Sequence, residues 1–97
     1  MSTLSSFKSF ADVFSHEREF EKMRHAIEEY DVVEKFKEIF PDLKSVAKPV
    51  KAEKATLFLR VENSVWRSEL NIRRSLMIEK INKFFSKKII TAIKFTA

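Results

Sequence analysis

The sequence predicts an α+β fold with the element order α–α–β–β–α–β, in which helices pack on one face of a three-stranded sheet. Two observations lead to this prediction. Apolar residues recur every three or four positions over residues 7–40 and 64–86, which is the period of a helix. Residues 46–61 and 89–95 instead alternate apolar and polar side chains, which is the period of a strand. Because 97 residues support one modest core, we expect a single domain, residues 1–97.

The first 40 residues predict helices. We expect the small, polar residues 1–6 to be disordered and a helical stretch to begin at Phe7. Ser15 can cap a second stretch, and Asp31 fits a capping box for a short helix that Pro41 ends. The second stretch has an amphipathic stripe made of Phe20, Met23, Ile27 and Tyr30.

The remaining residues predict two strands, a long helix and a third strand. Pro49 cannot donate to a ladder, so the first strand should lie at an edge, and the chain should reverse at residues 52–54. Asn63 and Ser64 can cap the long helix, residues 64–86. The periodicities predict a core made of Phe36, Leu57, Leu59, Val61, Trp66, Leu70, Met77, Ile81, Phe84, Ile93 and Phe95.

Composition excludes several classes of protein. The chain has no glycine, which excludes a P-loop, a G-x-G-x-x-G dinucleotide site and a G-x-S-x-G nucleophile elbow. It has no cysteine, which excludes disulfides and thiolate metal sites. His16 and His25 lack the i, i+4 spacing of a zinc pair. We expect a cytoplasmic, non-enzymatic protein with no cofactor, no metal and no membrane segment.

The charges are divided between the two halves of the chain. Residues 1–43 contain six basic and ten acidic residues, whereas residues 44–97 contain thirteen basic and four acidic ones. A helical, acidic first part is therefore followed by a basic second part. This asymmetry favours an anionic partner for the basic part, although electrostatic attraction between the two halves is an alternative.

Basic residues beside an aromatic one suggest a nucleic-acid site on an open sheet face. Cations contact phosphates, and an aromatic ring stacks on a base. The alternative is that the lysines protect an edge strand and keep the chain soluble. The candidate residues are Lys48, Lys51, Lys54, Phe58, Arg60, Lys87, Lys88 and Lys94.

Two other aromatic features have open interpretations. Trp66 could be a stacking platform, but its place in the main apolar stripe favours a core position. Phe7, Phe10 and Phe14 share one helical face that could close the core, bind a partner helix or form a homodimer.

One block resembles a known family. A hydrophobic strand over residues 57–61 is followed by a polar pair and by W-x-x-E-L at residues 66–70, and the chain ends with the I-x-F strand at residues 93–95. This pattern is similar to the DciA-like family of bacterial replicative-helicase loaders. Phe36 stands where that family usually has tryptophan, and Pro41 stands in place of its glycine.

The resemblance implies a K-homology-like fold, DNA binding and a role in DNA replication. The chain cannot use the Gly-x-x-Gly loop of true K-homology domains, because it has no glycine. We expect a DNA-binding accessory protein that prefers single-stranded or forked DNA and binds the replicative helicase. The alternative is a protein-interaction or dimerisation module that uses the Phe7–Phe14 face and does not bind nucleic acid.

Overall fold

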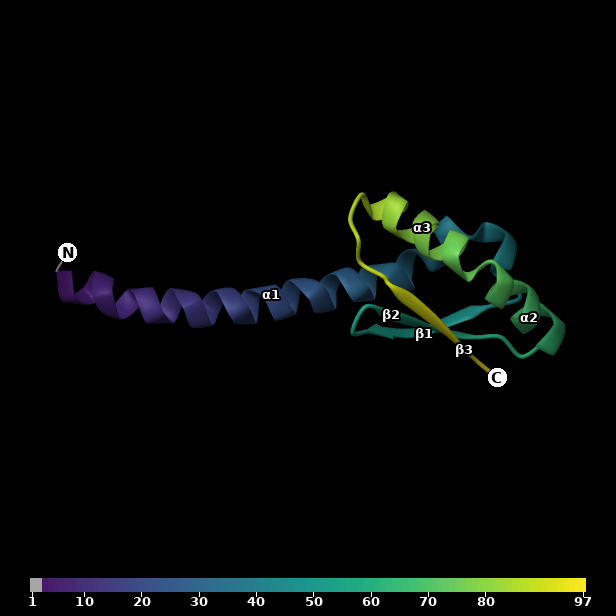
Figure 1. Cartoon of the computed structure of the whole chain (residues 1–97), viewed down its shortest axis with the longest axis horizontal. Coiled ribbons are helices and arrows are strands. Elements are labelled where there is room, and N and C mark those ends of the chain that lie inside the picture. Colours follow the sequence, from purple (N-terminus) through teal and green to yellow (C-terminus); the bar gives the residue numbers. More distant parts are fainter. Residues whose placement is uncertain (1–2) are drawn as a thin grey trace.

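The computed structural model describes the backbone of residues 3–97 and the side chains of residues 17–97. A long helix projects from a smaller globular part that contains the sheet and two further helices (Figure 1). The elements in chain order are α1 (Thr3–Ile39), the 3-10 turn η1 (Pro41–Leu43), β1 (Lys48–Glu53), β2 (Thr56–Arg60), α2 (Ser64–Ile72), α3 (Arg74–Phe85) and β3 (Ala92–Thr96).

The structure is α+β with a three-stranded sheet, but its helices differ from the predicted ones. Residues Thr3–Ile39 form one continuous helix and not separate stretches, so the predicted helix starts at Ser15 and near Asp31 were wrong. Both residues are tolerated inside a helix, and the first strong helix breaker is Pro41, which starts η1. The predicted long helix, residues 64–86, is instead broken at Arg73 into α2 and α3.

The sheet is mixed, with β2 in the centre. β1 pairs with β2 antiparallel, and β3 pairs with β2 parallel after the crossover through α2 and α3. The hairpin reverses at Lys54 and Ala55, not at residues 52–54 as predicted. These two residues have φ values of 52° and 59°, a left-handed conformation that two-residue hairpin turns require.

The hairpin turn is fixed by a contact from α1. The Ala55 N–H donates to the Glu29 carboxylate over 2.9 Å, and the Ala55 carbonyl accepts from the N–H groups of Thr91 and Ala92. These bonds compensate for a conformation that costs a non-glycine residue about 1–2 kcal/mol.

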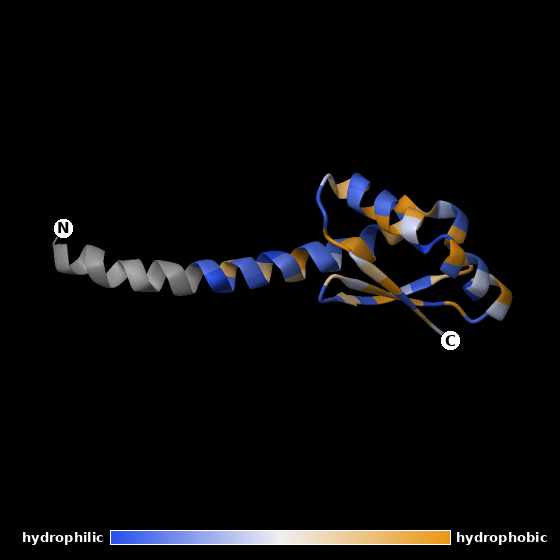
Figure 2. Cartoon of the chain, viewed as in Figure 1, coloured by the Kyte–Doolittle hydropathy of each residue, from blue (hydrophilic) through white to orange (hydrophobic). Residues whose placement is uncertain are grey.

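The core lies between the sheet and the helices that cover one of its faces. Figure 2 shows hydrophobic residues gathered there, and the largest fully buried side chains include Phe36 and Leu70. The other predicted core residues that are buried are Leu57, Leu59, Val61, Met77, Ile81 and Ile93, while Phe95 is partly buried against them.

Two predicted core residues are exposed, so their assignment was wrong. Trp66 is 38% exposed and Phe84 is 48% exposed. Both lie toward the ends of the predicted 64–86 helix. The break at Arg73 changes the direction of the chain, so a stripe computed for one straight helix does not stay on one side.

Membrane insertion through a helix has no support in the part of the chain that the structure describes. No helix there combines the length and the apolar character that crossing a bilayer requires.

Candidate nucleic-acid interface

The sheet face opposite the core presents four cations around one aromatic ring. Cross-strand pairing puts Lys48 opposite Arg60, and puts Phe58 between Lys51 on β1 and Lys94 on β3. We call these five residues the open sheet face. Their core-facing neighbours Leu57, Leu59 and Ile93 are buried, so strand alternation orients the open sheet face toward solvent.

A bulge in β1 determines which lysine joins this face. The pairing register shifts between Pro49 and Lys51, and the additional residue, Val50, is 55% exposed. Without the shift, Lys51 would share the core-side register of Pro49, because side chains alternate along a strand. The bulge therefore places Lys51 beside Phe58.

The Phe58 ring lies between two ammonium groups. The Lys51 Nζ atom is 5.0 Å from the ring centroid, and the Lys94 Nζ atom is 6.0 Å from it. Phe58 itself is half-buried, so the surrounding sheet restricts the ring. A ring held between two cations can stack on a nucleobase while the cations contact the neighbouring phosphates.

Two glutamates partly offset the positive charge of the open sheet face. Lys51 lies 3.5 Å from Glu53, and Arg60 lies 3.4 Å from Glu62. All four side chains are more than half exposed, and such exposed pairs contribute little free energy. A polyanion could therefore replace the two glutamates as partners of Lys51 and Arg60 at a small cost in free energy.

A groove at one end of the sheet adds Trp66 to this surface. Its lining includes Lys48, Arg60 and Trp66. The Asn63 side chain accepts a hydrogen bond from the Trp66 N–H over 3.0 Å, which fixes the first turn of α2. Sequence reasoning placed Trp66 in the core because, on the wheel of one straight helix, it lies in line with Leu70.

A second groove connects the open sheet face to the helices beside β3. Lys94 lines it together with Arg74 and Arg67. The Arg67 guanidinium donates to the carbonyls of Val61 (2.8 Å) and Glu62 (3.1 Å), so Arg67 mainly holds α2 against the end of β2. The exposed Arg74 extends the basic surface around this edge.

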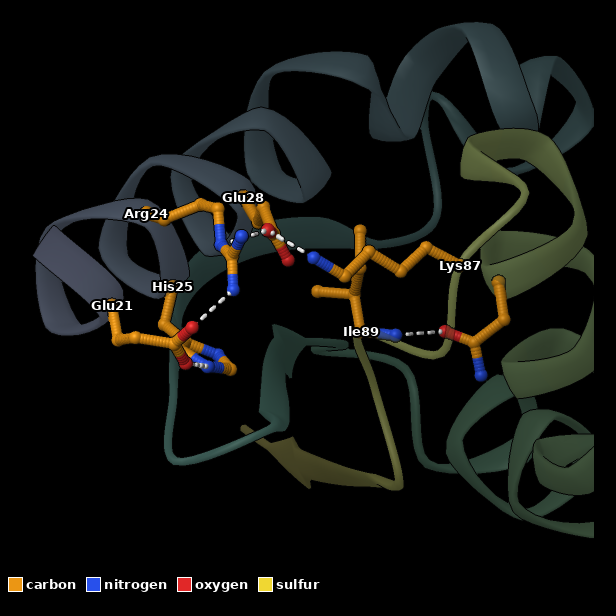
Figure 3. A network of polar contacts seen from close by, with 7 residues as sticks. Glu21, Arg24, His25, Glu28, Lys87 and Ile89 are labelled. Atoms are coloured by element: carbon orange, nitrogen blue, oxygen red, sulfur yellow. Dashed lines mark hydrogen bonds and ion pairs between the residues drawn. The ribbon is translucent and has the colours of Figure 1, made fainter. Parts of the chain in front are cut away.

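The remaining predicted cations lie elsewhere. Lys54 is in the hairpin turn, and Lys88 lines a different groove along α3. Lys87 donates to Glu28 of α1 over 2.6 Å, in the network of Figure 3. This hydrogen bond and the positive charge of Lys87 lower the pKa of Glu28 below its ordinary value of 4.5. Lys87 therefore fastens the loop after α3 to α1.

Other predicted features have no counterpart in this surface. The side chains of Phe7, Phe10 and Phe14 lie outside the described residues, as does that of His16. Among residues 17–97, no three histidine or acidic side chains form a group that could hold a metal ion. His25 contacts Glu21 on the exposed side of α1.

These features define a small α+β protein with a basic, aromatic-centred sheet surface. The model of one family, described as Dna[CI] antecedent, DciA, matches residues 9–95. The chain therefore belongs to the DciA family, which is associated with loading of the replicative helicase. None of the curated proteins compared with the sequence matches it.

Proposed function

We propose that this protein is a non-enzymatic accessory factor of bacterial DNA replication that binds single-stranded DNA through the open sheet face. The observation that carries the proposal is the Phe58 ring between Lys51 and Lys94, at 5.0 and 6.0 Å. Phe58 supplies a surface on which a base can stack, and the two lysines on the adjacent strands supply contacts to phosphates.

Single-stranded or forked DNA fits this surface better than duplex does. In duplex DNA the base faces are stacked on each other, so a half-buried ring on a sheet cannot reach them. An unpaired strand exposes its bases, and Trp66 at the end of the same sheet offers a second ring beside Lys48 and Arg60. We therefore expect a strand to run across β1, β2 and β3.

The proposal predicts a definite dependence on salt. Four phosphate contacts, one for each cation of the open sheet face, correspond to a slope of log K against log salt of about −3 for a single strand. The affinity should then fall about 50-fold between about 50 and 200 mM salt. Fluorescence anisotropy with a labelled oligothymidine measures this slope.

Charge reversal tests the location of the site. Arg60→Glu combined with Lys94→Glu should abolish measurable binding, because two phosphate contacts become repulsive. Lys83→Glu combined with Lys88→Glu makes the same change in net charge on exposed residues of the α3 side, and it should leave most of the affinity. Equal losses in the two double variants would show that only net charge matters, and no loss in the first would refute the proposal.

Phe58→Leu tests stacking separately from charge. Leucine keeps a half-buried apolar side chain but removes the ring, so the affinity should fall about tenfold while the salt slope stays the same. A variant that binds as tightly as the wild type would mean that Phe58 only packs within the sheet.

We further propose that the replicative helicase is the protein partner and that the bacterial cytoplasm is the place of action. Membership of the DciA family supports both statements. The order helix, two strands, two helices, strand, together with the mixed sheet, likewise supports a K-homology-like fold. Co-purification of the helicase with tagged full-length protein tests the partner, and its absence from the purified complex would count against it.

A further inference from the structure

The projecting helix α1 has an apolar stripe that no part of the same chain covers. Phe20, Met23, Ile27 and Tyr30 are 54–63% exposed. Figure 2 shows hydrophobic residues recurring along this part of α1, away from the globular part. Four large exposed side chains in one row are unusual for a helix that acts alone.

The stripe lies on the side of α1 opposite the globular part. Val32, Phe36 and Ile39 of the same helix are buried against the sheet and helices. At 3.6 residues per turn, the centres of the two rows are about 165° apart around the helix axis. The chain's own sheet therefore cannot cover the stripe, so any cover must come from another molecule.

The spacing of the stripe is that of a coiled-coil seam. The intervals of three, four and three residues put Phe20 and Ile27 at a positions and Met23 and Tyr30 at d positions of two heptads. In this register, Glu19 occupies the g position before the seam and Arg24 the following e position. In a parallel pair, the g residue of one helix lies next to the following e residue of its partner. Glu19 of each copy would therefore lie next to Arg24 of the other copy, which gives two such pairs in the dimer.

We propose that α1 pairs with α1 of a second copy of this chain as a parallel two-stranded coiled coil over residues Phe20–Tyr30. An antiparallel pair with the same residues in contact would put Arg24 opposite Arg24, which is repulsive. Arg24 contacts Glu21 and Glu28 in its own helix. These ion pairs are partly exposed, so replacing one of them by a contact with Glu19 of the second copy costs little free energy. The charges therefore select both the second copy and its direction.

The arrangement is also sterically open. Because the seam and the buried face of α1 are on opposite sides, the two globular parts lie on the outside of the helix pair, at the same end. The inference does not depend on nucleic-acid binding by the open sheet face. The Glu19–Arg24 pair flanks Phe20 and Met23, so the seam is stabilised by charge in the first of its two heptads.

Sedimentation equilibrium of the full chain tests the association. The wild type should form a dimer whose fraction rises with protein concentration, and Ile27→Asp should be a monomer because it buries a charge in the seam. Ile72→Asp is the matched control, because Ile72 is 80% exposed on α2, outside the seam, and it should dimerise like the wild type. A wild type that stays monomeric at all concentrations, or an Ile27→Asp variant that stays dimeric, overturns the proposal.

Two further experiments test the parallel direction. The chain has no cysteine, so Phe20→Cys gives a single thiol. In the parallel pair, position 20 meets itself and should oxidise to a disulfide-linked dimer, whereas in the antiparallel pair the two thiols are about 15 Å apart along the axis. Glu19→Arg and Arg24→Glu should each weaken self-association, and mixing the two variants should restore a dimer. Failure of both the crosslink and the mixed dimer refutes the parallel pair.

Discussion

Asn82 on α3 holds the loop that leads into β3, and its removal should strongly destabilise the protein. Its amide Nδ2 donates to the Ile90 carbonyl over 2.8 Å, and its Oδ1 accepts from the N–H groups of Ile89 and Ile90, each over 2.9 Å. A hydrogen bond contributes about 1 kcal/mol, and partly buried backbone groups left without a partner add to the loss. Asn82→Ala should therefore lower the free energy of unfolding by about 3 kcal/mol.

Urea denaturation followed by far-UV circular dichroism measures this difference. A loss of about 3 kcal/mol also lowers the melting temperature by about 15 °C in a domain of this size. Asn71→Ala is the control, because Asn71 is exposed on α2 and its replacement should change stability by less than about 0.5 kcal/mol. A loss below about 1 kcal/mol for Asn82→Ala would show that water replaces the three bonds, and the reasoning would be wrong.

Three more perturbations have defined outcomes. Phe36→Ala should cost about 3–5 kcal/mol in the same denaturation assay, because the ring is fully buried; a cost under about 1 kcal/mol would contradict its place in the core. Lys87→Met should destabilise the protein near neutral pH. The lowered pKa of Glu28 means that its contribution is complete above pH 4.5 and is lost as the pH falls through the lower folded-state value, so the difference from wild type should shrink there; a pH-independent difference would exclude this origin. Lys54→Asn combined with Ala55→Gly should raise the melting temperature by a few degrees, because both residues have positive φ; a decrease would show that Ala55 packing outweighs backbone strain.

Local patterns predicted the strands better than the helix boundaries. The alternation at Leu57 and Leu59 depends on burial of one sheet face, and both residues are buried. Helix ends depend on competition between weak signals, so the capping residues Ser15 and Asp31 were misleading inside α1. The break at Arg73 has neither proline nor glycine nearby, and no sequence signal marks it.

The candidate site was predictable only in part, for geometric reasons. Phe58, Arg60 and Lys94 follow from strand alternation and from the pairing of β2 with β3. The position of Lys51 depends on a bulge, and a one-residue shift in register moves a side chain to the other face. Trp66 was assigned to the core from a helical wheel that treats residues 64–86 as one straight helix. The sequence does not signal the break at Arg73, so the wheel could not take it into account.

The adjacent glutamates at the base of the projecting helix link distant parts of the molecule. Glu28 holds Lys87 in the loop that leads to β3, and Glu29 holds Ala55 at the tip of the hairpin that contains β2. The base of α1 is thus joined directly to the two segments that lead into the strands carrying Phe58 and Lys94. Both carboxylates come from the same helical turn, so the direction in which α1 leaves the globular part is set by the same two contacts that hold the hairpin tip and the loop before β3.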